Sequence, residues 1–469
     1  MDQIKIVKKN HAFMYIETDP SIEMELTEHF CFFVPGYKFM PAYRNKYWDG
    51  KIRLFDSRKK TLYIGLYKYL KQFALEREYE CISTTSKRYG SLEPEKDLNY
   101  IPKEWLDNLN LTSNQVPIQP RDYQLNALGH SLTNKNSLLL SPTASGKSLI
   151  IYLASRWYID NEPSKKILII VPTISLVEQM YSDFEDYGWS SGTYCQKIYQ
   201  GYDKKVEKDV VISTWQSIYK MPKKYFEQFG CVIGDEAHLF KSKSLTNIMT
   251  KLHLCKYRFG LTGTLDGTQT HRLVLEGLFG SVEKVVSTKE LIDNKTLANL
   301  NIECIVLKHT EENCKLVKDY SYAEEIDYLV LQPDRNNFIT GLCNSLKGNT
   351  LCLYQLVEKH GKNLYSLMRD FDKKVFFVYG GTDAKTRNDI RGIVEKEKNA
   401  IIIASYGTFS TGINIRNIDN IVFASPSKSK IRVLQSLGRG LRRGDKSESL
   451  KVFDISDDLT TAGGRINFT

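Results

Sequence analysis

A short stretch of small and polar residues, 141–148, limits the possible folds of this chain more than any other feature. It has the sequence Ser-Pro-Thr-Ala-Ser-Gly-Lys-Ser and lies between two apolar runs, 137–140 and 149–154. The first run is short and predicts a buried strand, and the second is longer and predicts a helix. A loop of this kind directs backbone N–H groups and a helix N-terminus towards an anion. We therefore expect a phosphate-binding loop in an α/β fold; the alternative is an ordinary strand–turn–helix corner with a surface lysine.

The residue types of this loop suit a bound nucleotide. Lys147 can reach terminal phosphates, and the Ser148 hydroxyl can ligate Mg²⁺. Gln124, about twenty residues upstream, carries an amide that can both donate to and accept from an adenine edge. Ser141 departs from the strict motif, which has glycine at that position. The expected ATP contacts in this part of the chain are Arg121, Gln124, Thr143, Ala144, Ser145, Gly146, Lys147 and Ser148.

Strand and helix patterns alternate after the loop, which predicts parallel sheets. In a first block, buried strands are expected at 166–171, 210–217 and 231–234. In a second block they are expected at 302–307, 350–354, 374–379, 400–405, 421–424 and 451–454. The predicted fold class is α/β, with two parallel-sheet lobes in tandem behind a small N-terminal α+β domain. The expected domains are residues 1–100, a linker at 101–119, a first lobe at 120–285 and a second lobe at 286–469.

An acidic pair ends the strand predicted at 231–234. Carboxylates at the C-terminal end of a parallel strand face the crevice where such sheets bind ligands. Asp235 can hold Mg²⁺ through water, and Glu236 can orient and polarise an attacking water. An acidic pair at this position is usually a helix cap, and the phosphate loop upstream favours the catalytic interpretation. His238, Thr262 and Thr264 are the residues expected to relay a change at the phosphate to neighbouring loops.

Two stretches of the second block complete the set of candidate nucleotide contacts. Residues 404–415 are small and rich in hydroxyls, which suits backbone contact with a phosphate chain, with Gly412 and Asn414 as expected ATP contacts. Arg439 and Arg442 lie three residues apart, on one face of a helix. Their planar donors match a γ-phosphate and can stabilise its transferring charge. A solvated basic helix is the alternative.

The N-terminal region contains a segment rich in basic and aromatic residues. Residues 37–60 hold eight Lys or Arg and six aromatic residues against two Asp. Basic groups attract the phosphate backbone, and flat rings stack on exposed bases. Asp49-Gly50 indicates a hairpin turn that would pair residues 47–48 with 51–55. The alternative is that the aromatic rings pack the core of the small domain. The expected nucleic-acid contacts here are Lys38, Arg44, Tyr47, Trp48, Lys51 and Arg53.

The overall composition is that of a globular protein with a polyanionic partner. The net charge of +10 favours nucleic acid. The nine cysteines are scattered and form no C-x-x-C pair, so neither a disulfide framework nor a zinc ribbon is expected. No signal peptide and no apolar run of about 18 residues occurs, so we expect no membrane contact. The expected location is the cytoplasm, or the host cytoplasm if the protein is viral.

Seven motifs occur in an order and spacing that is specific to superfamily 2 helicases. They are a Q motif around Gln124, motif I at 141–148, Ia at 171–175, II at 235–238 (a DEAH box), III at 262–264, V at 404–415 and VI at 435–443. The chain is therefore identified as a member of this superfamily over about residues 120–460. Two departures are Ala144, where many members have glycine, and serine rather than threonine after Lys147.

The superfamily implies two RecA-like lobes with ATP between them. The first lobe would supply Lys147, Ser148, Asp235 and Glu236, and the second Arg439 and Arg442, with Gln435 beside them. The lobes would grip one strand through backbone contacts, with Thr173, Trp215 and Thr411 as the expected DNA-binding residues. ATP and Mg²⁺ are the implied cofactors.

The N-terminal region also resembles one group within the superfamily, the phage UvsW-type recombination helicases. The resemblance rests on Gly-Tyr-Lys-Phe at 36–39, Trp-Asp-Gly-Lys-Ile-Arg-Leu at 48–54 and Arg-Asn-Asn at 335–337. It implies remodelling of branched DNA: forks, Holliday junctions, D-loops and R-loops. The expected partner is DNA with single/double-strand junctions, with RNA–DNA hybrids as a further possibility, bound by a monomer.

Three other functions remain open at this stage. The chain can be an RNA helicase or the motor subunit of a restriction complex, although no nuclease-type acidic cluster is evident outside the motor. It can be a DNA-binding module in which ATP is only a switch, which the intact Glu236 and the two arginines argue against. A small-molecule kinase is the third, and the second lobe with its arginine helix makes it improbable.

Overall fold

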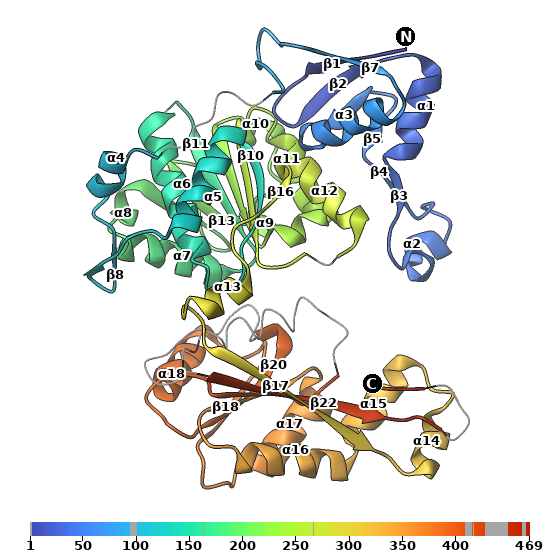
Figure 1. Ribbon diagram of the computed structural model, residues 1–469. Helices are drawn as coiled ribbons and strands as arrows, with labels where there is room; N and C mark the ends of the chain where they lie inside the picture. The colour runs from blue at the N-terminus through green and yellow to red at the C-terminus, as the bar shows by residue number, and fades with distance from the viewer. Residues whose placement is uncertain are drawn as a thin grey trace. The chain divides into compact units, whose positions relative to one another are not determined.

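The computed structural model describes residues 2–93, 101–162, 164–265, 267–408, 415, 417–426, 449–461 and 466–469. The chain divides into two compact units, Met1–Val286 and Ser287–Thr469. Each unit contains a parallel sheet, as the sequence predicts, and the first also carries a small N-terminal domain (Figure 1). No helix among the described residues is both long and apolar enough to cross a membrane.

The N-terminal domain is built on a five-stranded sheet with the order β5-β6-β2-β1-β7. The strands are β1 (Gln3–Lys8), β2 (Phe13–Glu17), β5 (Phe55–Asp56), β6 (Thr61–Tyr63) and β7 (Glu80–Thr84), and the helices are α1 (Pro20–His29) and α3 (Tyr67–Glu76). Alternate residues of β1, Ile4 and Ile6, are buried, which is the pattern of a strand with one covered face. Asp19 is the N-cap residue of α1, and Pro20 takes the first helical position.

A separate two-stranded ribbon carries the basic and aromatic segment. Strand β3 (Cys31–Phe33) pairs antiparallel with β4 (Lys51–Arg53). The chain between them forms a 3₁₀ turn, η1 (Tyr37–Phe39), and a short helix, α2 (Pro41–Arg44). Figure 1 shows α2 at the end of this ribbon, away from the five-stranded sheet. The predicted pairing of 47–48 with 51–55 is therefore wrong: β4 pairs with a strand that lies before the turn-and-helix segment.

Residues 101–120 contain more structure than a plain linker. The segment begins with a short helix, α4 (Lys103–Asn108). A small hairpin of β8 (Thr112–Ser113) and β9 (Val116–Pro117) follows it. Hydrogen bonds from Thr112, Ser113 and Asn114 to Asp186 attach this hairpin to the first lobe.

The first lobe is a seven-stranded parallel sheet with the order β12-β13-β11-β14-β15-β10-β16. The strands are β10 (Asn136–Leu140), β11 (Lys166–Val171), β12 (Cys195–Ile198), β13 (Val210–Thr214), β14 (Phe229–Asp235), β15 (Tyr257–Thr262) and β16 (Val282–Lys284). The longer helices are α5 (Asp122–Asn134), α6 (Lys147–Asn161), α7 (Ile174–Asp186), α11 (Lys243–Lys251) and α12 (Gln269–Phe279). Short helical segments are α8 (Ser191–Tyr194), α9 (Trp215–Ile218), α10 (Lys223–Phe226) and η3 (Ala237–Lys241).

The N-terminal domain packs closely on the first lobe. A 3₁₀ turn, η2 (Ile64–Leu66), lies against α12, and a Cβ atom on Gly65 would lie 1.9 Å from the backbone oxygen of Glu276. The hydroxyl of Tyr69 donates to the buried Glu276 carboxylate at 2.5 Å. The backbone N–H of His11 donates to the carbonyl of His253 at 3.0 Å. Side chains of both parts share one hydrophobic core, so this domain and the first lobe form a single packed unit.

The second unit is a six-stranded parallel sheet with the order β17-β22-β21-β18-β20-β19. The strands are β17 (Asn299–Lys308), β18 (Thr350–Tyr354), β19 (Val375–Val378), β20 (Ile401–Ser405), β21 (Asn420–Phe423) and β22 (Ser449–Asp458). Its helices are α13 (Thr288–Asp293), α14 (Glu311–Val317), α15 (Tyr322–Leu331), α16 (Pro333–Ser345), η4 (Val357–Gly361), α17 (Lys362–Met368) and α18 (Ala384–Val394). These strands overlap every strand that the sequence predicts for the second block.

A buried polar cluster joins the helices of the second unit to its sheet. The Arg335 guanidinium donates from Nε to both oxygens of Asp457, at 3.1 and 2.9 Å, and from Nη1 to the carbonyl of Ala424 at 2.8 Å. His309 Nε2 lies 2.9 Å from the same carboxylate. A buried charge is stable only when it is paired and hydrogen-bonded, so this pair ties α16 to β22.

Candidate nucleotide site and nucleic-acid interface

The predicted phosphate loop connects β10 to α6, and two of its residues have left-handed backbone conformations. Gly146 has a φ of +82° at the N-terminus of α6, and a Cβ there would lie 2.2 Å from Nε2 of Gln124. Ala144 has a φ of +66°. This conformation costs a residue with a Cβ roughly 1–2 kcal/mol, so glycine would be less strained than Ala144 at this position. The backbone of the loop therefore turns sharply at the N-terminus of α6, as a phosphate-binding loop does.

Hydroxyl groups brace the loop from inside. The buried Ser141 and Ser145 hydroxyl oxygens lie 2.6 Å apart, and the Ser145 hydroxyl donates to the carbonyl of Pro142 at 2.6 Å. The Ser145 proton is thereby used, so Ser141 is the donor between the two serines. Lys147 Nζ lies 3.3 Å from the carbonyl oxygen of Ser141. Serine at the position of the missing glycine thus has a structural role, which the sequence pattern did not reveal.

The upstream Gln124 contacts this loop directly. Its Nε2 donates to the carbonyl of Ser145 at 2.9 Å, and its Oε1 accepts from the backbone N–H of Arg121 at 2.8 Å. The hydroxyl of Tyr123 donates to the same Ser145 carbonyl at 3.1 Å and accepts from Arg121 Nη1 at 2.8 Å. One N–H and one acceptor site of the Gln124 amide remain for a base. The sequence pattern did not indicate that Tyr123 contacts the phosphate loop.

The acidic pair lies at the C-terminal end of β14, two strands away from β10 in the sheet. Asp235 is buried, and burial raises the pKa of its carboxyl to about 6. Glu236 also raises this pKa, whereas Lys147 lowers it. The Asp235 carboxylate is thus held next to another carboxylate, with Lys147 as a nearby cation.

The carboxylates of Asp235 and Glu236 fit a divalent cation such as Mg²⁺. A bound cation would favour the ionised form of Asp235 and so oppose the effects of burial and of Glu236. Mg²⁺ typically takes one or two carboxylates and completes its octahedron with waters and substrate phosphates. Consistent with that, the described residues hold no group of three or more metal-ligating side chains.

The three predicted coupling residues lie together between β14 and β15. His238 Nδ1 lies 3.0 Å from Thr262 Oγ1 and 3.3 Å from Glu236 Oε2. The Thr262 hydroxyl donates to the backbone carbonyl of Thr264 at 3.0 Å. The Thr264 hydroxyl is itself buried and has no partner among the described residues. A contiguous chain therefore runs from Glu236 through His238 and Thr262 to the backbone that follows β15.

Two of the predicted DNA contacts lie at the carboxyl edge of the same sheet. Thr173 is the N-cap of α7, and its Oγ1 accepts from the backbone N–H of Leu176 at 3.4 Å. Trp215 begins α9 and is half-buried against Tyr219. Strands β11 and β13 are neighbours, and Gln216 Nε2 donates to the Pro172 carbonyl at 3.5 Å. The structure thus brings the two regions together.

The segment from β3 to β4 is a small, internally braced element, which we call the aromatic module (residues 31–53). Tyr37 stacks on Phe33 with ring centroids 4.6 Å apart and meets Tyr43 edge-on at 4.8 Å. A Cβ on Gly50 would lie 2.3 Å from the Tyr37 ring. Trp48 Nε1 donates to the carbonyl of Lys51 at 2.9 Å. Tyr37 and Tyr43 thus pack within the module, whereas Phe55, at 2% exposure, is the ring of segment 37–60 that belongs to the core of the N-terminal domain.

Other aromatic rings of the module face solvent. Phe39 and Tyr47 are 85% and 86% exposed. Lys38, Arg44, Lys46 and Trp48 line a shallow pocket with Tyr43, Tyr47 and Asp49. Lys51 Nζ lies 4.9 Å from the Phe33 ring, and Arg53 forms an ion pair with Asp49. Phe39 was not among the predicted contacts; its high exposure distinguishes it from the half-buried Tyr37 and Tyr43.

Several predicted residues cannot be compared with the structure. Thr411, Gly412, Asn414, Gln435, Arg439 and Arg442 lie outside the described residues. Thr408, just before them, is described, and its hydroxyl lies 2.7 Å from that of Ser405 at the end of β20.

The fold and site define a class of protein, the nucleotide-dependent motors with two α/β lobes. Three features indicate this class: a phosphate loop after a parallel strand, an acidic pair at the end of another strand and a second parallel α/β unit. Comparison with known proteins specifies the class. Three families match: "Type III restriction enzyme, res subunit" at residues 117–267, "DNA helicase UvsW, N-terminal" at 3–83 and "Helicase conserved C-terminal domain" at 334–444.

One curated relative and one solved structure match nearly the whole chain. The ATP-dependent DNA helicase uvsW of Enterobacteria phage T4 is 36% identical over 461 residues, which is 97% of this chain and 90% of that protein. The crystal structure of T4 UvsW aligns with a TM-score of 0.55 over 98% of this chain and 91% of that one, at 35% identity. The chain therefore belongs to the UvsW family of superfamily 2 helicases. The structure of the restriction-modification enzyme LlaBIII bound to DNA aligns with a TM-score of 0.55 over 81% of this chain and 30% of that one. Its sequence identity is 17%, so it shares the fold alone.

Proposed function

We propose that this protein is an ATP-dependent DNA helicase or translocase that remodels branched DNA: forks, Holliday junctions, D-loops and R-loops. The observation that carries the proposal is the chain of contacts from the phosphate loop and acidic pair to His238 and Thr262, in a family whose T4 member is named an ATP-dependent DNA helicase. The proposed domains are residues 1–100, a linker at 101–119, the first lobe at 120–285 and the second at 286–469.

The residues of the first lobe would position the reacting groups. Lys147 would neutralise the terminal phosphates, and Ser148 and Asp235 would hold Mg²⁺, directly or through water. When bound, Mg²⁺ would supply positive charge that neutralises the phosphate groups. Glu236 would orient the attacking water, and Gln124 would contact the adenine base. Arg439 and Arg442 of the second lobe, with Gln435, would stabilise the transferring charge.

The DNA track would be held mainly through its backbone. Contacts at Thr173, Trp215 and Thr411 would carry little sequence information, so binding should depend on DNA structure and on salt. The aromatic module would add stacking on bases exposed at a junction. An RNA–DNA hybrid is a further possible substrate. We expect a monomer on DNA that acts in the cytoplasm, or in the host cytoplasm if the protein is viral.

The test is a substrate panel with matched site variants. ATP hydrolysis and strand separation would be measured on single-stranded, duplex, forked, four-way and RNA–DNA hybrid substrates. We expect the greatest activity on forked and four-way DNA, and loss of turnover in Lys147→Ala and Glu236→Gln. Near-normal DNA-stimulated hydrolysis in either variant would refute the site, whereas equal activity on simple duplex would refute only the branched-DNA role.

A further inference from the structure

A cavity of about 420 Å³ lies where the N-terminal domain meets the first lobe. One wall comes from the N-terminal domain, at the end of β1, at η2 and at the start of α3. The other comes from the first lobe, between α5 and β10, before β15 and after α12. Its volume is within the range of small-molecule sites, roughly 300–1,000 Å³.

This cavity is separate from the phosphate loop. Asn136, the first residue of β10, lines it, whereas the loop begins after Leu140 at the other end of the same strand. Lys256, just before β15, also lines it, and the other end of β15 is Thr262 of the coupling chain. The proposed nucleotide chemistry therefore does not account for this cavity.

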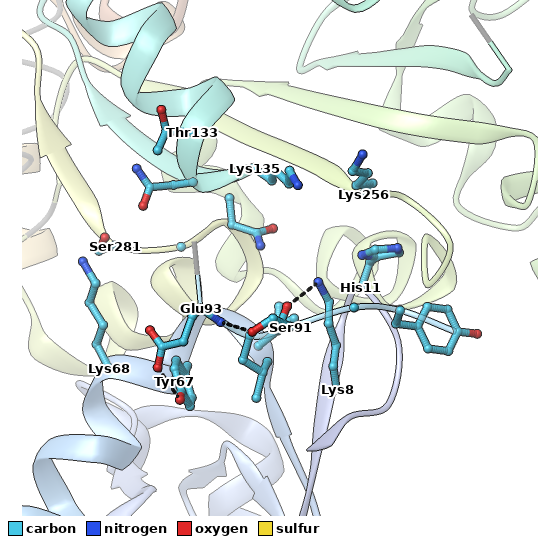
Figure 2. A pocket seen from close by; sticks show the side chains of 18 of the residues that line it. Lys8, His11, Tyr67, Lys68, Ser91, Glu93, Thr133, Lys135, Lys256 and Ser281 are labelled. Atoms are coloured by element: carbon cyan, nitrogen blue, oxygen red, sulfur yellow. Dashed lines mark hydrogen bonds between the residues drawn. The ribbon is translucent and has the colours of Figure 1, made fainter. Parts of the chain in front are cut away.

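Lysines from both parts of the unit surround the cavity. Figure 2 shows Lys8 and Lys68 of the N-terminal domain on one side, with Lys135 and Lys256 of the first lobe across from them. Lys71 also lines the cavity, and its Nζ pairs with Glu93 at 3.1 Å. Glu93 is the only acidic residue among the described lining residues, and it also accepts from the Tyr67 hydroxyl at 2.8 Å. The described lining thus carries an excess of positive charge.

His11 lines the same cavity, and nearby cations lower its pKa. Burial, with the charges of Lys8, Arg258, Lys256 and Lys165 as further causes, lowers the pKa of this histidine to about 3. The ring is therefore neutral at physiological pH and packs edge-on against Tyr89, with centroids 5.5 Å apart. The four cations act on His11 in the same direction, so this end of the cavity favours an anion.

The rest of the lining suits an organic ligand rather than a bare ion. Ile64, Leu92 and the rings of Tyr67 and Tyr89 supply apolar surface. Asn136 has a buried side-chain oxygen that accepts no hydrogen bond from any described residue. The lining therefore combines apolar surface with polar groups, as sites for organic ligands do.

We propose that this cavity binds the terminal phosphate of a nucleotide-sized ligand, either a free nucleotide or the phosphorylated end of a nucleic-acid strand. The phosphate would lie among the lysines, and the sugar or base would face the tyrosines and Asn136. Cations from the two walls repel each other across the cavity, and a phosphate between them removes that repulsion. Ligand binding would therefore strengthen the docking of the N-terminal domain on the first lobe.

The test uses the full-length chain with Lys147→Ala, so that the phosphate loop does not dominate nucleotide binding. AMP, a 5′-phosphorylated tetrathymidylate and the same oligonucleotide with a 5′-hydroxyl would be titrated by calorimetry. Lys68→Glu would be compared with Lys224→Glu, a charge reversal on exposed α10 outside the cavity. Melting curves would show that both variants fold.

We expect Lys68→Glu to weaken binding of AMP, or of the 5′-phosphorylated oligonucleotide, by at least about tenfold, the worth of one charge-assisted hydrogen bond. Lys224→Glu should leave this affinity unchanged. Preference for AMP identifies a free nucleotide, and preference for the phosphorylated over the hydroxyl oligonucleotide identifies a strand end. Equal affinities in the two variants, or no binding of either phosphate compound, would overturn the proposal. Neither result depends on helicase activity, so the proposed function is tested separately.

Discussion

Nδ1 of His238 donates a hydrogen bond to the Thr262 hydroxyl across 3.0 Å. The direction follows from proton counting. The Thr262 hydroxyl has one proton and gives it to the carbonyl of Thr264, so it can only accept from the imidazole. Nδ1 must therefore carry the proton, and the same N–H faces Glu236 Oε2 at 3.3 Å. This fixed tautomer links the candidate water-orienting carboxylate to the end of β15.

Thr262→Val should uncouple hydrolysis from strand separation. It removes the acceptor of a buried N–H but keeps the shape, so we expect strand separation per ATP hydrolysed to fall about tenfold. ATP affinity should hardly change, because Thr262 hydrogen-bonds to Ser141 of the phosphate loop through its backbone carbonyl, which the substitution keeps. The ratio of unwinding to hydrolysis on forked DNA measures the effect. Thr262→Ser keeps the hydroxyl and should behave as wild type; equal defects in both variants would contradict the coupling role.

Phe39→Ala with Tyr47→Ala should weaken binding to forked DNA. Each stacked base contributes about 1–3 kcal/mol, so the double variant should lose about tenfold or more in affinity. Both side chains are exposed, so the melting temperature should not change. Fluorescence anisotropy with a labelled fork measures the affinity. Tyr37→Ala is the contrasting variant, because its ring packs on Phe33 and Tyr43 and its loss should lower stability as well.

In the first lobe, the strands that the sequence predicts lie inside the sheet. The runs at 166–171 and 231–234 are apolar because their strands lie inside the seven-stranded sheet. β15, inside the sheet, was not predicted either; the other two strands that escaped prediction, β12 and β16, are its two edges. They contain Gln196, Lys197, Glu283 and Lys284, since an edge strand is partly open to solvent. In this sheet, a strand that is buried on both faces has an apolar sequence, and this sequence signal is weaker in the edge strands.

The parts of the site that the sequence did not predict depend on contacts between distant residues. The Asp49-Gly50 turn is a local signal, but the partner of β4 is Cys31–Phe33, which no local pattern indicates. Ser141 acts as a brace only because Ser145 folds back onto it. The lysines around the cavity are ordinary surface residues in the sequence, and only domain packing brings them together.

Gly65→Ala should disrupt the docking of the N-terminal domain. The added Cβ would lie 1.9 Å from the backbone oxygen of Glu276, and backbone atoms of a packed helix cannot move aside cheaply. We expect a loss of about 1–3 kcal/mol in stability, the usual cost of overpacking. Thermal melting and limited proteolysis between the two parts measure it. Gly192→Ala, where a Cβ would meet only the Tyr181 hydroxyl at 3.8 Å, is the control and should be nearly neutral.

The second unit should lose stability as the pH falls below 6.5, because of His360. Its Nδ1 lies 2.7 Å from Ser425 Oγ and its Nε2 lies 3.1 Å from Asn336 Oδ1, so both ring nitrogens are occupied. Burial, with Arg335 as a second cause, lowers the pKa of His360 to about 3. In the unfolded chain this pKa is about 6.5, so between these values only the unfolded state takes up the proton. The penalty at pH 5 is about 2 kcal/mol, since each pKa unit is worth 1.36 kcal/mol.

Denaturant unfolding followed by circular dichroism between pH 7.5 and pH 5 measures this loss. Tryptophan fluorescence separates the two units, because all five tryptophans lie in Met1–Val286 and do not report on the second unit. His360→Gln should lower stability at neutral pH but flatten its decline towards pH 5. The half-buried His253, replaced by Gln, is the control and should leave the slope of the second unit unchanged. An unaltered slope in His360→Gln would show that a different group takes up the proton on unfolding.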